Sequence, residues 1–446
     1  MSTAQSSASQ PYFTAVSNAS AIQSIVVDAG IANPRSEPPD LQYPFASEPA
    51  DPPADPPAPA YALTHSGPAE VVQTTPVSCT YGAFRVWRTL GEGTYGVAMG
   101  AQDVASNRLL CLKVFPKHHL ERKARKCVLL NELEAYKRLS RALPCPAARF
   151  LMGLEMSFQT RDKICFAMDL MASDLYSYLQ RQPTYCIRNS GRWVAQMTLG
   201  INTLHEMGII HRDIKAGNIL IDSRENVRIT DFGVSYVDKN EGPLDRQRNY
   251  CSQEAGTTHT MAPEVLHNGS DSRPLKYGAP ADWWSLGCVI YELISKKHKA
   301  RFESSFAAIL LISSRQSLFV TKDDIRSYVS WCSSRDRPSK QFPAFEELHE
   351  ALADLISGLL QPNPSSRFGF VEVVNHKSFL CKAGTSEFLD VYSRALERKE
   401  VPSSLPDLRC GRETNAAEIW FRQPSWEKPR VPNVDWVKPA LLSPFL

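Results

Sequence analysis

Two short polar segments near the middle of this chain constrain its fold and chemistry more than any other feature. The sequence HRDIKAGNIL occupies residues 211–220, and DFG follows at residues 231–233. Polar residues between apolar runs ordinarily form a solvated loop. Here they also supply oxygen ligands of the kind magnesium prefers, a carboxylate for a hydroxyl group and a cation for a moving phosphoryl group. The residues that together predict phosphate chemistry are Asp213, Lys215, Asn218 and Asp231.

A glycine-rich segment, GEGTYG at residues 91–96, lies upstream of these two segments. Taken alone, it also fits a dinucleotide-binding turn, but such a turn opens directly into a helix. Here a strand is predicted to follow, at residues 108–115, and it carries Lys113. Glycines let backbone amides approach phosphates, and a lysine on the following strand can reach them. A buried lysine needs a carboxylate partner, for which Glu132 is the first candidate and Glu134 the alternative.

Composition divides the chain into three parts. Residues 1–82 contain 13 of the 32 prolines, and seven acidic residues against one basic residue, which predicts an unfolded linker. Residues 83–380 predict one domain, with strand patterns up to residue 171 and mainly helical patterns over 172–380. We therefore expect an α+β fold, in which a small antiparallel β-sheet lobe with one helix precedes a larger, mainly α-helical lobe. Residues 381–446 predict a C-terminal extension that packs on the domain through dispersed aromatic residues.

Hydrophobic periodicity places the main elements of the two lobes. In the small lobe, apolar runs at 150–158 and 163–170 predict strands, and residues 122–139 predict a helix. In the larger lobe, residues 191–208 and 282–294 have the three- and four-residue spacing of helices. A basic run, KHHLERKARK, overlaps the start of the small-lobe helix. We interpret this run as a solvated helix face rather than a docking site for acidic partners.

Charge and cysteine content exclude several classes of protein. The formal net charge is only +3, and the eleven cysteines are scattered without a CxxC pair. The first basic residue is Arg35, so the N-terminus lacks the charged region of a secretory signal. No apolar run approaches the roughly 20 residues that a membrane-spanning helix needs. We expect reduced thiols in the cytoplasm and/or nucleus, no nucleic-acid partner and no membrane span; the oligomeric state is open, with a monomer expected.

Taken together, the motifs resemble a eukaryotic protein kinase domain of the serine/threonine type over roughly residues 84–380. Their style is similar to the group that contains the cyclic-AMP-dependent kinase, although the tail lacks a clear FxxF motif. The resemblance implies ATP and Mg²⁺ as cofactors and protein substrates as phosphate acceptors. It implies that Asp213 is the catalytic base, that Lys215 stabilises the moving phosphoryl group, and that Asn218 and Asp231 hold magnesium.

The resemblance also implies a set of nucleotide-contacting residues. Lys113 contacts the phosphates and pairs with Glu132, Met168 is the gatekeeper of the adenine pocket, and residues 169–171 form the hinge. The full set is Gly91, Glu92, Gly93, Gly96, Ala98, Cys111, Lys113, Glu132, Met168, Asp169, Met171, Asp174 and Leu220. Kinases generally have valine and alanine where this chain has Ala98 and Cys111, so we expect a compensated adenine pocket in which ATP protects Cys111 from alkylation.

Three further motifs imply structural or regulatory roles. MAPE at residues 261–264 matches the end of an activation segment whose Glu264 pairs with Arg367, and Asp282 supports the catalytic loop. Lys215 and the GTT sequence at 256–258 favour serine or threonine as acceptor. Arg212 is found in kinases activated by a phosphorylated loop, which makes Ser252 a candidate phosphosite. Tyr236, however, stands where a second cation is common, so the sequence leaves phosphorylation of this loop open.

Two alternatives remain beside an active protein kinase. A pseudokinase scaffold usually lacks the strand lysine, the catalytic aspartate or the DFG aspartate, and all three are present here. A small-molecule kinase of related fold generally lacks the MAPE segment, which forms a platform for an extended peptide. Both alternatives are therefore disfavoured by the motifs.

Overall fold

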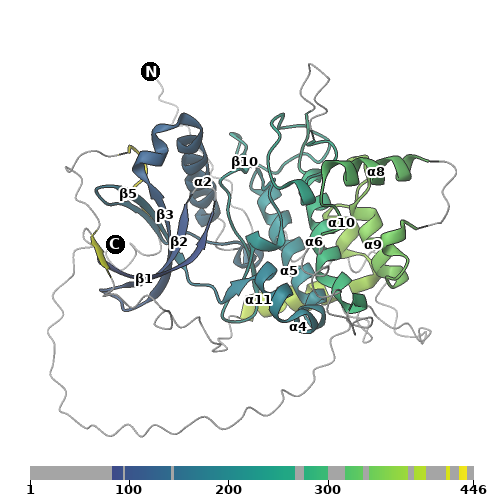
Figure 1. Cartoon of the computed structure of the whole chain (residues 1–446), viewed down its shortest axis with the longest axis horizontal. Coiled ribbons are helices and arrows are strands. Elements are labelled where there is room, and N and C mark those ends of the chain that lie inside the picture. The colour runs from purple at the N-terminus through teal and green to yellow at the C-terminus, as the bar shows by residue number, and fades with distance from the viewer. Residues whose placement is uncertain are drawn as a thin grey trace, which may run out of the picture.

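The computed structural model consists of two lobes, a sheet with one long helix and a larger group of helices (Figure 1). It describes residues 83–93, 96–141, 145–266, 276–299, 317–334, 341–379, 386–397, 418–421 and 431–438. The predicted linker at 1–82 lies outside these residues. Within them, no helix combines the length and the apolar character needed to cross a membrane.

The small lobe is built on an antiparallel sheet of seven strands in the described part of the chain, in the order β11-β1-β2-β3-β5-β4-β12. Helix α2 (Lys123–Arg141) belongs to the same lobe. This arrangement confirms the predicted small lobe. The strand bounds are β1 Ala83–Glu92, β2 Val97–Asp103, β3 Leu109–Pro116, β4 Met156–Gln159, β5 Lys163–Asp169, β11 Glu418–Phe421 and β12 Trp436–Val437.

Alternation along β3 assigns its side chains to two different environments. Leu110, Leu112 and Val114 are buried in a small cluster on one face of the sheet. Phe115, whose parity is opposite, is buried in the main core together with residues of α2. Because side chains two residues apart lie on the same face, Cys111 and Lys113 share the α2 face. Lys113 is thereby directed toward the helix that carries its predicted partner.

The larger lobe is mainly helical, which confirms the other half of the predicted fold. Helix α5 is almost entirely buried at its centre, as are the apolar residues of α6, so these two helices form the middle of the lobe. The helices are α3 Leu175–Arg181, α4 Pro183–Arg188, α5 Ser190–Glu206, α6 Pro280–Lys299, α8 Lys322–Ser333, α9 Glu350–Leu359, α10 Phe370–Val374 and α11 Glu387–Glu397.

Short strands in the larger lobe fix the positions of the HRDIKAGNIL and DFG segments. Strand β8 (Ile219–Ile221) lies between β6 (Ser173–Asp174) and β9 (Val227–Ile229), and β7 (Ile209–Ile210) pairs with β10 (Tyr236–Val237). The catalytic-loop segment therefore runs from β7 to β8. The DFG segment runs from β9 to β10, directly beside it.

Two sequence predictions about the small lobe need correction. The strand that follows the glycine turn is β2, and Lys113 lies one strand later, on β3. The run at 150–158 is not one strand: its first residue ends the 3₁₀ helix η2 (Pro146–Phe150), and only Met156–Gln159 forms β4. Leu151 instead forms an isolated parallel bridge with Ile229, and the Met152 amide donates to the Ile229 carbonyl oxygen. Both side chains are buried in the main core.

The C-terminal extension returns to both edges of the small-lobe sheet. Strand β11 pairs with β1, and β12 pairs with β4 through Trp436 and Val437. The backbone of Val431 exchanges hydrogen bonds of 2.9 and 3.0 Å with the side chain of Gln159. Helix α11 contacts α5 in the larger lobe. The extension is thus ordered where it is described, while the predicted domain boundary at residue 380 stays a prediction.

Val434 tests how much this docking stabilises the protein. Its side chain is fully buried in the main core, and its carbonyl oxygen accepts a hydrogen bond from the Ser157 hydroxyl. We expect Val434→Ala to lower the free energy of unfolding by about 1–3 kcal/mol, measured by urea denaturation, because it removes buried methyl groups. Val104→Ala, at a 48% exposed position, is the matched control and should change stability by less than about 0.5 kcal/mol. Equal small effects would show that residues 431–438 do not dock.

Candidate active site

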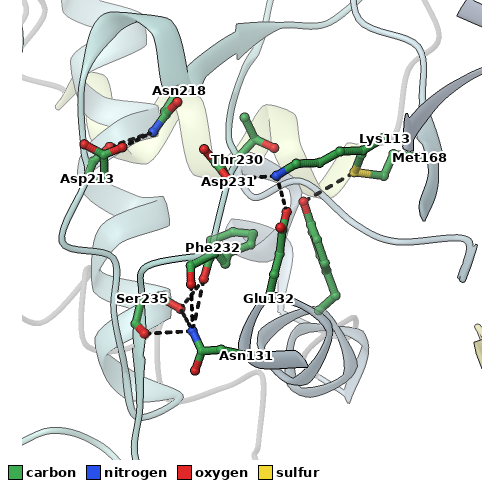
Figure 2. A network of polar contacts seen from close by, with 12 residues as sticks. Lys113, Asn131, Glu132, Met168, Asp213, Asn218, Thr230, Asp231, Phe232 and Ser235 are labelled. Atoms are coloured by element: carbon green, nitrogen blue, oxygen red, sulfur yellow. Dashed lines mark hydrogen bonds and ion pairs between the residues drawn. The ribbon is translucent and has the colours of Figure 1, made fainter. Parts of the chain in front are cut away.

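Lys113 lies between two carboxylates at the junction of the lobes (Figure 2). Its Nζ atom is 2.7 Å from Oε1 of Glu132 and 2.8 Å from Oδ1 of Asp231. Strand β3 supplies the lysine, helix α2 supplies Glu132, and the segment after β9 supplies Asp231. The predicted Lys113–Glu132 pair is therefore present, and the alternative partner, Glu134, is exposed on the other side of α2.

The three charges share one environment, buried at Glu132 and partly open at Asp231, in which one cation faces two carboxylates. Burial raises the pKa of Glu132 to about 7, although the Lys113 ammonium acts in the opposite direction. Burial alone would also raise the pKa of Asp231, but the charge and hydrogen bond of Lys113 hold it below its usual value. Burial opposes the charge on Lys113, yet its two acidic neighbours raise its pKa overall. Lys113 is thus a permanent cation here.

A second polar cluster surrounds the carboxylate of Asp213. Oδ2 of Asp213 accepts hydrogen bonds from Lys215 Nζ at 2.8 Å and from Asn218 Nδ2 at 3.0 Å. Oδ1 accepts one from the Thr257 hydroxyl at 2.6 Å, and Lys215 also donates to that hydroxyl at 2.7 Å. Thr257 belongs to the GTT sequence, so the end of the activation segment contacts the catalytic loop directly. This geometry orients the Asp213 carboxylate.

Asp282 of α6 fixes the backbone of the two residues that precede Asp213. The Asp282 carboxylate is fully buried and accepts hydrogen bonds of 2.8 Å from the backbone amides of His211 and Arg212. The His205 ring is 2.8 Å from the same carboxylate. Burial alone would raise the pKa of Asp282, but the His205 hydrogen bond and the amides lower it. The role predicted for Asp282 is therefore present in the geometry.

Two residues of the site have backbone angles that side chains rarely adopt. Arg212 has φ of 67° and Asp231 has φ of 68°. Such left-handed conformations cost free energy at residues other than glycine, and they persist only where surrounding contacts hold them. The Asp282 bonds hold Arg212, and the Lys113 ion pair holds Asp231. Strain at these two positions marks the catalytic-loop and DFG segments as a built site.

A buried ion pair anchors the end of the activation segment to the larger lobe. Arg367 donates to both carboxylate oxygens of Glu264, at 2.6 and 2.9 Å, and its side chain is fully buried. The same guanidinium also donates to backbone carbonyls of Gln361 and Pro280. The pair predicted from the MAPE segment is therefore present. It holds residues 261–264 against the start of α6.

Comparison with known protein families decides the identity of this arrangement. The protein kinase domain family matches residues 84–379, about two thirds of the chain, and this range covers every polar cluster described above. The chain belongs to the protein kinase family.

Curated relatives include serine/threonine kinases of known name. The chain is 28% identical over 289 residues to G protein-coupled receptor kinase 1 of Caenorhabditis elegans, covering 64% of this chain and 39% of that protein. It is 27% identical over 310 residues to the RAC-beta serine/threonine-protein kinase of Rattus norvegicus, covering 68% and 55%. It is 30% identical over 219 residues to G protein-coupled receptor kinase 2 of Drosophila melanogaster, covering 48% and 28%. The chain thus spans less than two thirds of each of these kinases.

The glycine-rich loop of this kinase connects β1 to β2, and its residues Thr94 and Tyr95 lie outside the described part. Gly91 and Glu92 end β1, and the amide of Gly93 bonds to the carbonyl oxygen of Gly96 at 2.9 Å. A Cβ at Gly96 would lie 2.7 Å from the Val114 carbonyl oxygen, so packing alone requires glycine there. A Cβ at Gly91 would meet no atom within 4 Å, so packing does not require glycine at this position. Glycine at this position agrees with a role in approaching phosphates.

The residues predicted to surround adenine lie along neighbouring strands. Ala98 is opposite Lys113 on β2, and Cys111 is opposite Met168 at the end of β5. Met168 is buried, and its sulfur accepts a hydrogen bond from the Tyr136 hydroxyl of α2 at 3.3 Å. Burial raises the pKa of the Cys111 thiol to about 11, so its alkylation at neutral pH should be slow. The nucleotide contacts of these residues stay predictions.

The hinge residues have structural partners of their own. Asp169 is half-exposed and faces Arg108 at 3.3 Å and Arg228 at 3.5 Å, while Met171 is buried. Asp174 is the N-cap residue of α3, and its carboxylate accepts hydrogen bonds from the amide and hydroxyl of Ser177. Leu220 lies on β8 opposite Asp174 and packs against the core. Asp169 thus ends β5, and Asp174, a few residues further along the chain, pairs directly with Leu220.

The donor set at the site suits magnesium bound together with a nucleotide. The amide nitrogen of Asn218 is used by Asp213, so its oxygen is directed elsewhere (Figure 2). Asp231 uses one carboxylate oxygen for Lys113, and its side chain is 38% exposed. The described residues contain no group of three or more His, Cys, Asp or Glu able to hold a metal by themselves. Mg²⁺ commonly uses one or two protein oxygens and completes its shell with phosphates and water.

Asn131 is a site residue that the sequence patterns did not reveal. It precedes Glu132 on α2, and its amide nitrogen faces carbonyl oxygens of Phe232, Gly233 and Ser235, at 3.3, 3.3 and 2.8 Å (Figure 2). Three acceptors that converge on one atom require a donor there. Asn131 thus ties the position of α2, and with it the Lys113–Glu132 pair, to the backbone after Asp231. A single polar residue on a helix gave no sequence signal for this contact.

We expect Asn131→Asp to disturb this contact strongly, because it places carboxylate oxygens against three carbonyl oxygens. The free energy of unfolding should fall by about 1–3 kcal/mol in urea denaturation, with a parallel loss of kinase activity. Asn202→Asp, where the amide donates to Glu206 one turn along α5, is the matched control and should have a much smaller effect. Wild-type stability and activity in Asn131→Asp would contradict the contact.

Proposed function

We propose that this protein is an ATP-dependent serine/threonine protein kinase that transfers the γ-phosphate of ATP to a hydroxyl group of a protein. The observation that carries this proposal is the network around Asp213, in which Lys215, Asn218 and Thr257 all bond to one carboxylate. Family membership and the names of the related kinases support the same activity.

Asp213 is the group that receives the acceptor hydroxyl in this proposal. Its carboxylate is oriented by hydrogen bonds to both of its oxygens, so an approaching hydroxyl finds an oriented acceptor for its proton. Lys215 lies between Asp213 and Thr257 and places positive charge where negative charge develops on the phosphoryl group. Lys113, held by Glu132 and Asp231, supplies the cation for the α and β phosphates. Bound magnesium would neutralise phosphate charge, with Asn218 and Asp231 as its protein ligands.

Acceptor choice follows from the same residues. Lys215 contacts the Thr257 hydroxyl of the GTT sequence, and this pairing is the feature that favours serine and threonine acceptors over tyrosine. We further infer that the protein acts as a monomer in the cytoplasm and/or nucleus and does not bind nucleic acid. The small net charge and the scattered spacing of the cysteines, without a CxxC pair, support these inferences.

The experiment that tests the proposal is phosphate transfer from γ-labelled ATP to casein and myelin basic protein, with phosphoamino-acid analysis of the product. We expect label on serine and threonine, and loss of labelling when EDTA removes Mg²⁺. Label mainly on tyrosine would contradict the acceptor class. ATP binding without any transfer would favour a scaffold over an enzyme.

A further inference from the structure

Arg212, the residue before the catalytic aspartate, donates two of its side-chain hydrogen bonds to neutral groups. Its Nε donates to the carbonyl oxygen of Val234 at 2.6 Å, and its Nη1 donates to the hydroxyl of Tyr277 at 3.1 Å. Val234 follows the DFG sequence, and Tyr277 precedes α6. Arg212 therefore connects the catalytic loop, the start of the activation segment (residues 231–264) and the larger lobe.

The Tyr277 hydroxyl continues this connection into the middle of the activation segment. A tyrosine hydroxyl can accept and donate at once, and this one accepts from Arg212 and donates to the carbonyl oxygen of Gln253 at 2.6 Å. Tyr277 is 1% exposed. Burial raises its pKa to about 12, so the hydroxyl keeps its proton near neutral pH. Ser252, the candidate phosphosite, is the neighbour of the residue that Tyr277 holds.

Backbone bonds fix the same stretch a second time. Cys251 and Tyr277 form an antiparallel bridge, with amide-to-carbonyl distances of 3.0 and 2.8 Å, and the Tyr250 amide also donates to the Tyr277 carbonyl at 2.8 Å. A side chain at Gly278 would clash with the carbonyl oxygen of Arg248, so the two backbones are in close contact. The segment around Ser252 is thus held on both sides by Tyr277 and its neighbours.

The surrounding contacts are mainly aromatic, with Arg248 as an additional cation. Tyr236, at the position where a second cation is common, packs on Tyr250 with ring centroids 5.6 Å apart. The guanidinium of Arg248 lies over the Tyr250 ring, 5.2 Å from its centroid. Cys251 is buried beside Arg212 and Tyr277, and burial raises the pKa of its thiol to about 11. A phosphate on Ser252 would bring up to two negative charges beside a segment whose backbone is already held by Tyr277.

We propose that Tyr277 is a positioning residue that takes the place of an activation-segment phosphate. Its hydroxyl and backbone hold residues 250–253 on Arg212, so that catalysis does not require phosphorylation of Ser252. This inference rests on the proposed kinase activity and adds the regulation of the same site.

The test uses the full chain, purified after phosphatase treatment, with intact mass confirming that no phosphate remains. Initial rates on myelin basic protein are measured before autophosphorylation raises the mass. We expect the dephosphorylated protein to be active and Ser252→Ala to keep kcat/KM within about twofold of wild type. We expect Tyr277→Phe, which removes only the hydroxyl, to lower kcat/KM for the protein substrate by about 10-fold, because a hydrogen bond to a charged group is lost.

Two further readouts separate positioning from general destabilisation. In Tyr277→Phe, KM for ATP should stay within about twofold, since Lys113 and Asp231 are untouched, while amide exchange should rise in residues 248–256. Tyr236→Phe is the matched control. It also removes one hydroxyl from the activation segment, but that hydroxyl donates to Asp238 rather than contacting Arg212. The Tyr236→Phe variant should keep wild-type kinase activity. If Tyr277→Phe is as active as Tyr236→Phe, the positioning role is wrong.

The outcomes for the inference and for the proposed function differ. Activity that appears only when Ser252 is phosphorylated would overturn the inference and leave the kinase activity standing. A wild-type protein that transfers no phosphate in either phosphorylation state would overturn the proposed function, and the inference with it. Activity of the dephosphorylated protein together with loss in Tyr277→Phe supports both.

Discussion

Replacing Asp213 by asparagine should lower kcat for protein phosphorylation by about 10²–10⁴-fold, the range expected when a positioned general base is removed. Asparagine keeps the size of the side chain, so it can still lie near Lys215 and Thr257, but it does not accept a proton from the substrate hydroxyl. The measurement is the initial rate of phosphate transfer, combined with ATP affinity by calorimetry. We expect ATP affinity to change little, because Asp213 faces the acceptor side of the site.

The control for this variant is Asp323→Asn on α8, where the side chain is 83% exposed and pairs with Arg326 in the same helix. It should leave kcat unchanged. Persistent transfer and autophosphorylation in Asp213→Asn, at rates near those of wild type, would mean that catalysis is assigned to the wrong carboxylate.

Replacing Arg367 by methionine should lower the free energy of unfolding by about 3–5 kcal/mol, because it leaves Glu264 as a buried carboxylate without its partner. The loss is expected to be large because the guanidinium is fully buried and also satisfies backbone carbonyls of Gln361 and Pro280. Denaturation in urea measures the change. Kinase activity should fall in parallel, since the end of the activation segment loses its anchor.

Arg326→Met provides the comparison on the surface. Arg326 is 53% exposed and its ion pair with Asp323 lies within one helix, so its loss should cost at most about 0.5 kcal/mol. The double variant Glu264→Gln with Arg367→Met should recover part of the stability lost in Arg367→Met, because no unpaired buried charge remains. A small effect of Arg367→Met on its own would show that this pair is not a principal anchor.

The clustering of the candidate site residues was predictable because their types and spacing leave few alternatives. Asp213, Lys215, Asn218 and Asp231 lie in two short segments, and the structure brings the first three into one hydrogen-bonded cluster. The pairing of Lys113 with Glu132 rather than Glu134 was open, because one helix pattern admits two phases. Helix α2 settles it by burying Glu132 and exposing Glu134.

Contacts that depend on tertiary placement were not predictable from the sequence. Strand β2 was missed because its sequence, VAMGAQD, lacks strong alternation and contains a glycine. Asn131 gave no signal, since the three carbonyls it faces come from a segment about 100 residues later. The same holds for Tyr277, whose bonds to Arg212 and Gln253 join segments that no local pattern relates. Strands β11 and β12 were expected only as parts of a packed extension. Such short segments form strands because they pair with the edges of an existing sheet, and the sequence does not show that pairing.

One structure determination tests the central claim most directly: crystals of the protein with a non-hydrolysable ATP analogue and Mg²⁺. We predict that Lys113 contacts the α and β phosphates, that oxygens of Asn218 and Asp231 bind Mg²⁺ at about 2.0–2.1 Å, and that Asp213 faces the γ-phosphate end. A nucleotide bound away from these four residues, or metal ions held by other side chains, would contradict the account.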